Sequence, residues 1–261
     1  MCIKDNNSED KLNYLIKDDE TLDDLQLKGI HVIQKKTAFR FGVDAVLLAN
    51  YARVKKGSRV IDLCTGTGII PFIIAGKTEA SNITGIEIQS EMVEMSDRTV
   101  LYNNLQNRIN FINGDLKDLR LLKGLEKSDV VTVNPPYKLH NSGLINPNDK
   151  NAIARHEICC KLEDVIIACK TVLKDNGRMY MIHRPDRLVD IMCLMRKHKL
   201  EPKSIRMIHP SISKAPNILL IEGQKNGGSF LKWEAPLYIH TEDGGYTDEI
   251  EKIYGRDKQS S

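Results

Sequence analysis

The strongest constraint on the fold is an alternation of short apolar segments with longer stretches of helical length, running from Arg59 to Gln224. The short segments are rich in Val, Ile and Met, which is typical of buried strands. Strands that alternate with helices predict a mostly parallel sheet with helices on both faces. The last two segments, PKSIRMIHP and NILLIEGQ, are joined by a loop too short for a crossover helix, so we expect them to be antiparallel. The sequence therefore predicts an α/β fold with a seven-stranded, mostly parallel sheet and an antiparallel C-terminal strand.

The expected elements have defined positions along the chain. The expected parallel strands are RVIDL, NITGIEI, RINFING, SDVVTVN and GRMYMIH, and the expected helices are residues 69–77, 90–105, 161–175 and 185–199. Pro71 is tolerated because it lies in the first turn of its helix, and Ser90 is a good N-cap. Asn176 and Gly177 are expected to end the third helix.

The rest of the chain is organised around this core as a single domain. Residues 1–23 are polar, acidic and aperiodic, and we expect a flexible leader. The domain itself is predicted to span residues 24–255. It comprises an entry segment at residues 24–57, a catalytic core at residues 58–224 and a C-terminal extension at residues 225–255. The entry segment is expected to hold a hairpin that turns near Gly29 and the helix VDAVLLANYAR.

Composition excludes some classes of protein. Of the 261 residues, 41% are hydrophobic, which is the balance of a soluble globular chain. No apolar run approaches the roughly 18 residues of a membrane span, and no secretory signal is visible. The cysteines form no C-x-x-C pair and no set with zinc-ligand spacing. We therefore expect a cytoplasmic protein with reduced thiols, no metal site and no membrane association.

The formal charge is unevenly distributed along the chain. The whole chain carries +3 while residues 1–26 carry −5 and residues 241–261 carry −3, so the segment between them carries +11. Six cations lie between residues 196 and 214, with only Glu201 opposing them. A basic body suits a polyanionic partner such as nucleic acid. A solvated surface with no partner explains the same charges equally well.

Glycines and acids at successive strand ends form the first candidate site. The segment Asp62–Gly68 follows the first strand, Glu87 ends the second and Gly114–Asp115 ends the third. Ligands of open α/β sheets bind at this edge, and glycine lets the backbone approach them closely. Asp62 can accept from an ammonium group or a water, Glu87 from two ribose hydroxyls, and Asp115 from an adenine amino group. The set indicates a nucleoside pocket. The third glycine of the dinucleotide fingerprint is missing, which disfavours a nicotinamide oxidoreductase.

The motif Asn134-Pro135-Pro136-Tyr137 ends the fourth strand and forms the second candidate site. Two prolines lock the backbone and leave carbonyls without competing donors. The Asn134 side-chain carbonyl and the Pro135 backbone carbonyl can accept the two N–H groups of an exocyclic amine and direct its lone pair at a methyl donor. Tyr137 can stack on a flipped base. A rigid turn after a buried strand is the alternative for this motif taken alone.

The two sets together resemble the motifs of class I S-adenosylmethionine-dependent methyltransferases, which have a Rossmann-like fold. The resemblance implies S-adenosylmethionine as the cofactor and Asn134, Pro135 and Tyr137 as catalytic residues. The cofactor-binding residues that it implies are Asp62, Thr65, Gly66, Gly68, Glu87, Asp115 and Asn134.

Segments outside the shared core resemble a narrower family, the bacterial tRNA(Val) adenine-N6 methyltransferases. They are FRFGVDAVLLANYARV, Ala154–Glu157 with the following KLEDVIIACKTVLKDNGR, and LYIHTEDGGYTDEIEKIYG. This resemblance covers residues 24–255. It implies N6-methylation of an adenine in tRNA, of the anticodon-loop type, without an obligate protein partner. Candidate substrate contacts are Arg155, Lys203, Arg206 and Lys214, and the loop from Lys138 to Asn151 is where specificity is expected.

Three alternatives remain open at this point. An rRNA guanine-N2 methyltransferase and a protein glutamine-N5 methyltransferase share the same amine chemistry. The second usually carries a helical N-terminal domain, whereas the first core strand here begins near Arg59. A non-catalytic RNA-binding protein that keeps the fold is the alternative from another class, and the presence of Asn134 and Glu87 disfavours it.

Overall fold

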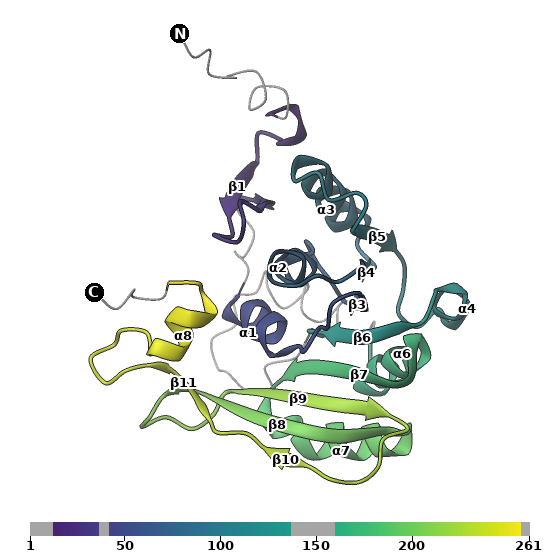
Figure 1. The fold of residues 1–261 in the computed structure, drawn as a ribbon, viewed down its shortest axis with the longest axis vertical. Helices are drawn as coiled ribbons and strands as arrows, with labels where there is room; N and C mark the ends of the chain where they lie inside the picture. The colour runs from purple at the N-terminus through teal and green to yellow at the C-terminus, as the bar shows by residue number, and fades with distance from the viewer. Residues whose placement is uncertain (1–12, 37–41, 137–159, 257–261) are drawn as a thin grey trace, which may run out of the picture.

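The computed structural model describes residues 13–36, 42–136 and 160–256, and its centre is a nine-stranded sheet (Figure 1). The strand order is β10-β8-β9-β7-β6-β3-β4-β5, and β11 also pairs with β8. The strands are β3 (Arg59–Leu63), β4 (Asn82–Glu87), β5 (Ile109–Asn113), β6 (Ser128–Val133), β7 (Leu173–His183), β8 (Leu200–Ser211), β9 (Ile218–Lys225), β10 (Lys232–Trp233) and β11 (Leu237–His240). Strand β9 is antiparallel to both β7 and β8, and the other pairs in this sheet are parallel. The predicted mostly parallel sheet is confirmed, and β10 and β11 extend it beyond the seven expected strands.

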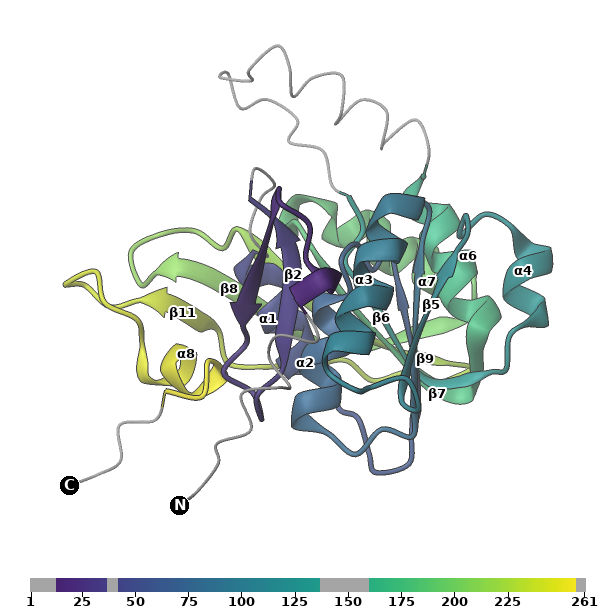
Figure 2. The ribbon, with the colours of Figure 1, turned by 90° about the horizontal axis from the view of Figure 1, so that it is seen from above.

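Helices cover both faces because the strands bury apolar side chains on both sides. In β3, Val60 belongs to one apolar core and Ile61 to the other, as the alternation of side chains along a strand requires. The first core is covered by α1 (Val43–Tyr51), α2 (Ile69–Lys77) and part of α3 (Ser90–Tyr102). The second is covered by α4 (Leu119–Gly124), α6 (Leu162–Val172) and α7 (Leu188–Lys197). The C-terminal helix α8 (Asp248–Ile253) packs against α1 and β11 (Figure 2).

The helices differ from the prediction in several places. Helix α3 ends at Tyr102 rather than at residue 105, and α7 spans Leu188–Lys197 rather than residues 185–199, because Pro185–Arg187 form a separate 3-10 turn. Gln89, not Ser90, is the N-cap of α3. Helix α6 ends at Val172 rather than at residue 175, because Leu173 already pairs with Ser128 of β6. The Asn176-Gly177 turn therefore lies in an irregularity of β7. Helix α4 was not expected from the sequence, and its N-cap Asp118 accepts hydrogen bonds from two backbone N–H groups of its first turn.

An N-terminal hairpin packs beside the main sheet. Strands β1 (Glu20–Asp24) and β2 (His31–Lys35) are antiparallel, and the connecting segment contains Gly29 at φ +74°, which confirms the expected hairpin. The leader was expected to extend to residue 23, but β1 already begins at Glu20. The folded part of the chain therefore includes residues 20–23, which the sequence predicts to be part of the leader.

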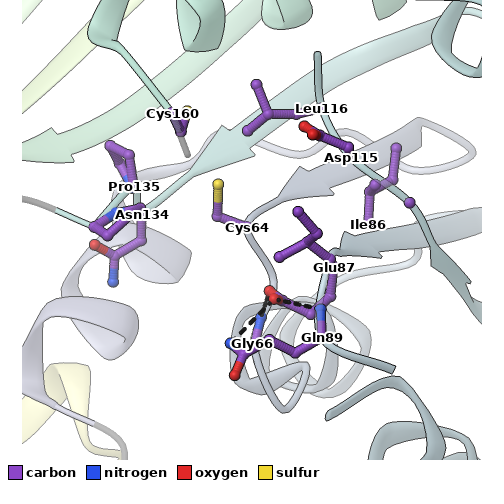
Figure 3. A pocket seen from close by; sticks show the side chains of 13 residues that line it. Cys64, Gly66, Ile86, Glu87, Gln89, Asp115, Leu116, Asn134, Pro135 and Cys160 are labelled. Atoms are coloured by element: carbon purple, nitrogen blue, oxygen red, sulfur yellow. Dashed lines mark hydrogen bonds between the residues drawn. The ribbon is translucent and has the colours of Figure 1, made fainter. Parts of the chain in front are cut away.

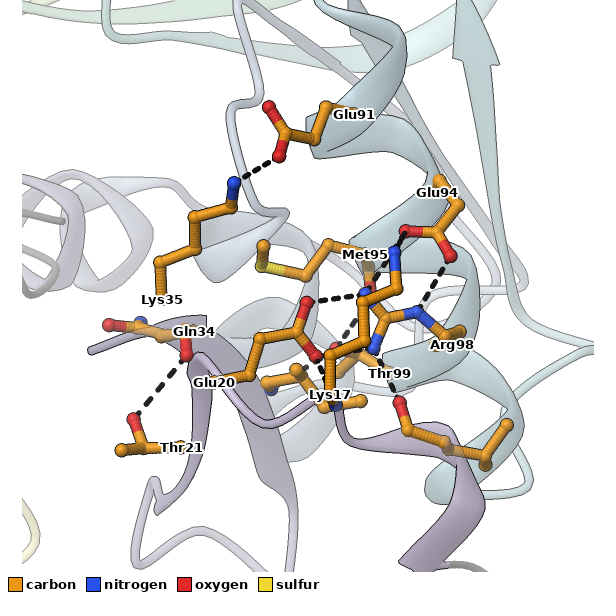
Figure 4. A network of polar contacts seen from close by, with 12 residues as sticks. Lys17, Glu20, Thr21, Gln34, Lys35, Glu91, Glu94, Met95, Arg98 and Thr99 are labelled. Atoms are coloured by element: carbon orange, nitrogen blue, oxygen red, sulfur yellow. Dashed lines mark hydrogen bonds and ion pairs between the residues drawn. The ribbon is translucent and has the colours of Figure 1, made fainter. Parts of the chain in front are cut away.

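Polar contacts fasten the hairpin to α3 (Figure 4). The Arg98 guanidinium donates to both Glu20 carboxylate oxygens at 2.6 Å, and it also contacts Glu94. Burial alone would raise the pKa of Glu20, but the hydrogen bonds from Arg98 and from the Lys17 backbone outweigh it, so the pKa is lowered. Breaking this bidentate pair would leave a buried charge without its partner, which is strongly destabilising.

The parallel strands end at one edge of the sheet, and the loops that follow them meet there. These loops follow β3, β4, β5, β6 and β7, and the β8–β9 connection lies at the same edge because β8 runs parallel to β7. No helix in the described part of the chain has the length and apolar character needed to cross a membrane.

Candidate functional site

A cavity of about 430 Å³ lies at this carboxyl edge (Figure 3). Its wall is made by the end of β4, by the loops after β3, β4, β5 and β6, and by one residue that precedes α6. The lining residues include Cys64, Gly66, Ile86, Glu87, Ile88, Gln89, Gly114, Asp115, Leu116, Asn134, Pro135, Pro136 and Cys160. The predicted set from successive strand ends is thus brought together around one space.

The loop after β3 is shaped by left-handed backbone conformations. Cys64 and Gly66 both have φ +56°, and Gly68 has φ +78° as the N-cap of α2. A Cβ on Gly66 would meet no atom within 4 Å, so bare backbone faces open space at this wall. A Cβ on Gly68 would lie 2.4 Å from the Phe111 ring, so this glycine is required for close packing. The two glycines have different roles, one at the ligand surface and one beneath it.

Glu87 ties the loops after β3 and β4 together while lining the cavity. One carboxylate oxygen accepts from the Gly66 N–H at 2.9 Å, and the other accepts from the Gln89 N–H at 3.1 Å. The residue is buried, with 6% of its surface exposed. The oxygen that accepts from Gly66 has a second lone pair for a ribose hydroxyl. The other also accepts from the Gln89 side chain at 3.3 Å, so a second ribose hydroxyl would take the place of that side-chain contact.

Asp62 is placed differently from the expectation that it would meet the ligand directly. It is fully buried and is not among the residues that line the cavity. Its two oxygens accept hydrogen bonds of 2.6 Å from the hydroxyls of Thr65 and Thr132. Burial raises the pKa of Asp62 to about 7, although the two hydroxyls oppose this shift. Asp62 thus supports the loop after β3 through its hydrogen bond with Thr65, and it links β3 to β6 through its hydrogen bond with Thr132.

The loop after β5 completes the far wall of the cavity. The Gly114 N–H donates to the Glu87 carbonyl at 2.9 Å, which holds this loop against the end of β4. Asp115 lines the cavity, and its carboxylate also accepts from the Lys117 N–H at 2.8 Å. Leu116 and Ile86 provide apolar wall on either side of it. An acceptor between apolar surfaces can hold a flat heterocycle that carries an amino group.

Asn134 and Pro135 stand at the end of β6, beside the glycine loop. Because Leu63 pairs with Val133, Cys64 and Asn134 are the next residues on the two neighbouring strands. Asn134 is half-buried, Pro135 is buried, and both line the cavity. The predicted amine-binding pair therefore adjoins the predicted nucleoside pocket. Tyr137, the third predicted catalytic residue, lies outside the described residues.

Several residues that line the cavity are not predicted by the two motif sets. Gln89 lies two positions after Glu87 and donates to it from both its backbone and its side chain, a local pattern that the sequence could have indicated. Cys160 lies 26 positions after Asn134 and carries no motif. Gly85 is also constrained, because a Cβ there would lie 2.4 Å from Phe111.

The basic residues between 196 and 214 do not form one surface at this edge. Strand β8 begins at Leu200 opposite Lys225, so Arg196 lies near the amino edge of the sheet, where it pairs with Glu201 at 2.7 Å. Arg206 makes a two-pronged pair with Glu249 at 2.7 and 2.8 Å. Lys203 donates to the Gly228 carbonyl at 2.9 Å. Each of these cations already has a partner within the protein.

Lys214 alone among the described candidate substrate contacts lies at the carboxyl edge. It is exposed in the β8–β9 connection, where its carbonyl is 2.8 Å from the His209 ring nitrogen. Arg155, the remaining candidate, lies outside the described residues, as does the loop Lys138–Asn151. No group of three or more His, Cys, Asp or Glu residues able to hold a metal ion occurs in the described ranges.

Comparison with known proteins agrees with this geometry. Residues 54–225 match the family model of the methyltransferase domain. The chain is 27% identical to a Porphyromonas gingivalis protein named tRNA1(Val) (adenine(37)-N6)-methyltransferase, over 88% of this chain and 93% of that protein. It is 24% identical to an Aeromonas hydrophila protein of the same name, over 85% of this chain and 91% of the relative.

Solved structures show the same fold. A predicted O-methyltransferase from Agrobacterium tumefaciens superposes with a TM-score of 0.65 at 23% identity, covering 82% of this chain and 97% of that one. P. horikoshii TYW2 in complex with MeSAdo gives a TM-score of 0.54 at 14% identity, covering 81% and 73%. Because the family match spans more than half of the sequence, the chain belongs to the methyltransferase domain family, and it is an S-adenosylmethionine-dependent methyltransferase of the class I fold.

Proposed function

We propose that the protein methylates N6 of an adenine in tRNA, in the anticodon loop. The observation that carries the proposal is the position of Asn134 and Pro135 on the wall of the cofactor cavity, directly beside the glycine loop. The names of the relatives, which share 24 to 27% identity over most of the chain, supply the nucleobase and the RNA. The proposed location is the cytoplasm.

The proposed role of Asn134 and Pro135 is to position the adenine amino group. The lone pair of an adenine amino group is delocalised into the ring, so the nitrogen is a weak nucleophile. Two acceptors that hold its N–H groups draw the nitrogen toward tetrahedral geometry and free the lone pair. The side-chain oxygen of Asn134 and the carbonyl of Pro135 are such acceptors, and the proline ring keeps the second one in place.

The residues of the cavity fit the cofactor. S-adenosylmethionine, when bound, supplies a methyl group on a positively charged sulfur. Glu87 would hold the ribose hydroxyls, Asp115 the adenine amino group, and the bare backbone at Gly66 would allow close approach. Asp62 and Thr65 would keep the loop rigid through their buried hydrogen bond.

RNA contacts are proposed where free positive charge lies at the carboxyl edge. Lys214 meets this condition, because it is exposed in the loop that joins β8 and β9. Phosphate contacts of this kind would position the RNA without reading its sequence. A role for Arg206 or Lys203 in substrate binding stays a prediction, and it requires each side chain to leave its present partner.

The test is transfer of a labelled methyl group from S-adenosylmethionine to bulk tRNA that lacks its modifications, followed by nucleoside analysis. The expected product is N6-methyladenosine. Labelled N2-methylguanosine would move the substrate to guanine. An unlabelled tRNA, together with intact cofactor binding, would move it to ribosomal RNA or to a glutamine side chain of a protein.

A further inference from the structure

Arg184 lies at the carboxyl edge immediately beyond β7, next to the amine-binding pair. Val133 of β6 pairs with Met181 of β7, so Asn134 is level with Ile182 and the residue after Pro135 is level with Arg184. Neighbouring strands are about 5 Å apart, well within the reach of an arginine side chain. Arg184 is thus one strand away from the residues proposed to hold the target base.

The alternation of side chains places Arg184 and Asn134 on the same face of the sheet. Met181 and Val133 both belong to the second core, whereas Tyr180 and Ile182 belong to the first. Arg184 has an extended backbone, with φ −81° and ψ 141°, so its side chain points to the same face of the sheet as that of Ile182, two residues earlier. Asn134 is level with Ile182 on the neighbouring strand, and its side chain points to that face as well. The two side chains therefore leave their strands toward the same side.

Arg184 is half-buried, and its side chain has no hydrogen-bond or ion-pair partner among the described residues. The other described arginines that lie half-buried do have partners, such as Glu20 for Arg98 and Glu249 for Arg206. A guanidinium carries five donors and no acceptor, so an unpaired one at this edge is available to an anionic ligand. Its planar fork matches the oxygens of a phosphate.

The turn that carries Arg184 is held by its neighbour. The Arg184 backbone N–H donates to Nδ1 of His183 at 2.8 Å. Burial, helped by the nearby Arg187, lowers the pKa of His183 to about 4, so the ring stays neutral at physiological pH and keeps this nitrogen as an acceptor. Arg184 is therefore displayed from a fixed backbone rather than from a loose loop.

We propose that Arg184 binds a backbone phosphate of the RNA beside the target adenosine, and so holds the flipped nucleotide while Asn134 and Pro135 hold its base. The inference rests on the proposed function, because it takes a nucleic acid as the substrate. It adds a substrate-binding residue that lies outside the cofactor and amine-binding motifs.

The experiment measures binding of unmodified tRNA at increasing KCl concentration, with S-adenosylhomocysteine present, for the wild type, R184Q, R184K and R196Q. R184Q should weaken binding roughly tenfold and lower the slope of log affinity against log salt by about 0.7 to 0.9. R184K should keep most of the slope but bind several-fold more weakly, because it lacks the planar fork. R196Q removes the same charge from the amino edge and should match the wild type.

Two further readouts separate the possible failures. Methyl transfer to tRNA by the wild type tests the proposed function independently of Arg184, and its absence would remove that function. Cofactor affinity, measured without RNA, should be equal in all four proteins. If wild-type transfer is present but R184Q binds tRNA with the same affinity and the same salt slope as R196Q, Arg184 is not a phosphate contact. If R184Q loses cofactor affinity instead, the guanidinium serves the cofactor carboxylate and the inference is wrong.

Discussion

The sequence predicts functional residues both at the strand ends around the cavity and along strand β8, and the structure places these two sets very differently. Gly66, Glu87, Asp115 and Asn134 come from four strands and line one cavity. The cations of β8 and its flanks are spread over both edges of the sheet. Arg206 is neutralised by Glu249, an acid 43 positions away.

The difference lies in what fixes each side chain. A residue at the end of a parallel strand is placed by the backbone, since all such ends meet at one edge. The position of a surface cation's charged group is set by the acids and carbonyls that it contacts, and these can lie anywhere in the sequence. Motifs at strand ends therefore identify a site, whereas a run of basic residues identifies only charge.

The largest expected effect is at Asn134. Replacing it with Ala should lower single-turnover methyl transfer by about 10² to 10³-fold, because one of the two acceptors for the amine is lost. Cofactor affinity, measured by titration, should change little. Asn134→Asp keeps an acceptor oxygen and should retain more activity than Ala. An equal loss of cofactor binding and of transfer would contradict the division of the site into a cofactor part and an amine part.

The glycine loop gives the next largest effect. Gly68→Ala should destabilise the protein by about 3 kcal/mol, since a left-handed φ is strained for Ala and its Cβ would collide with Phe111. Thermal or urea unfolding measures this change. Gly124→Ala is the matched control, because Gly124 lies in α4 with no atom within 4 Å of a Cβ and has no positive φ. Equal stabilities of the two variants would show that the loop is not under this constraint.

The same distinction, between features placed by the local sequence and features placed by contacts with distant residues, applies to the fold as a whole. The order of strands and helices from Arg59 follows from hydrophobic patterning, and so do the hairpin at Gly29 and the short α2. The end of α6 could not be foreseen, because Leu173 leaves the helix to pair with Ser128, a contact between distant segments. The role of Asp62 was missed for a related reason. Its motif position suggests a ligand contact, but Thr132, which takes one of its oxygens, comes from another strand.

Asp62 gives a smaller effect that depends on pH. Its carboxyl has a pKa of about 7 in the folded protein because of burial, against 3.8 normally, so the folded state binds the proton more tightly than the unfolded state. The stability that this group contributes is therefore complete below the unfolded pKa and is lost as pH rises through about 7. Between about pH 5.5 and pH 8, wild-type stability should fall relative to that of Asp62→Asn by on the order of 2 kcal/mol.

Unfolding of both proteins across this range measures the difference directly. Taking the difference matters because His183, whose pKa burial lowers to about 4, acts in the opposite direction in both proteins and cancels. A difference that does not change with pH would mean that Asp62 is ionised throughout. In that case the buried carboxylate would be compensated by more than the two hydroxyls of Thr65 and Thr132.

The smallest effects test whether exposure at the carboxyl edge, rather than charge alone, decides which cations meet RNA. Lys214→Gln should lower the salt slope of tRNA binding by less than about 0.9 without changing stability, because Lys214 is exposed there. Arg206→Gln should cost up to about 1 kcal/mol of stability through its lost ion pair and leave the slope unchanged. Both variants remove one positive charge, so a slope that falls equally in both would mean that RNA responds to net charge and that the edge has no special role. A larger fall in Arg206→Gln would mean that the ion pair with Glu249 opens when RNA binds. That result would support the prediction that the cations of β8 contact the RNA.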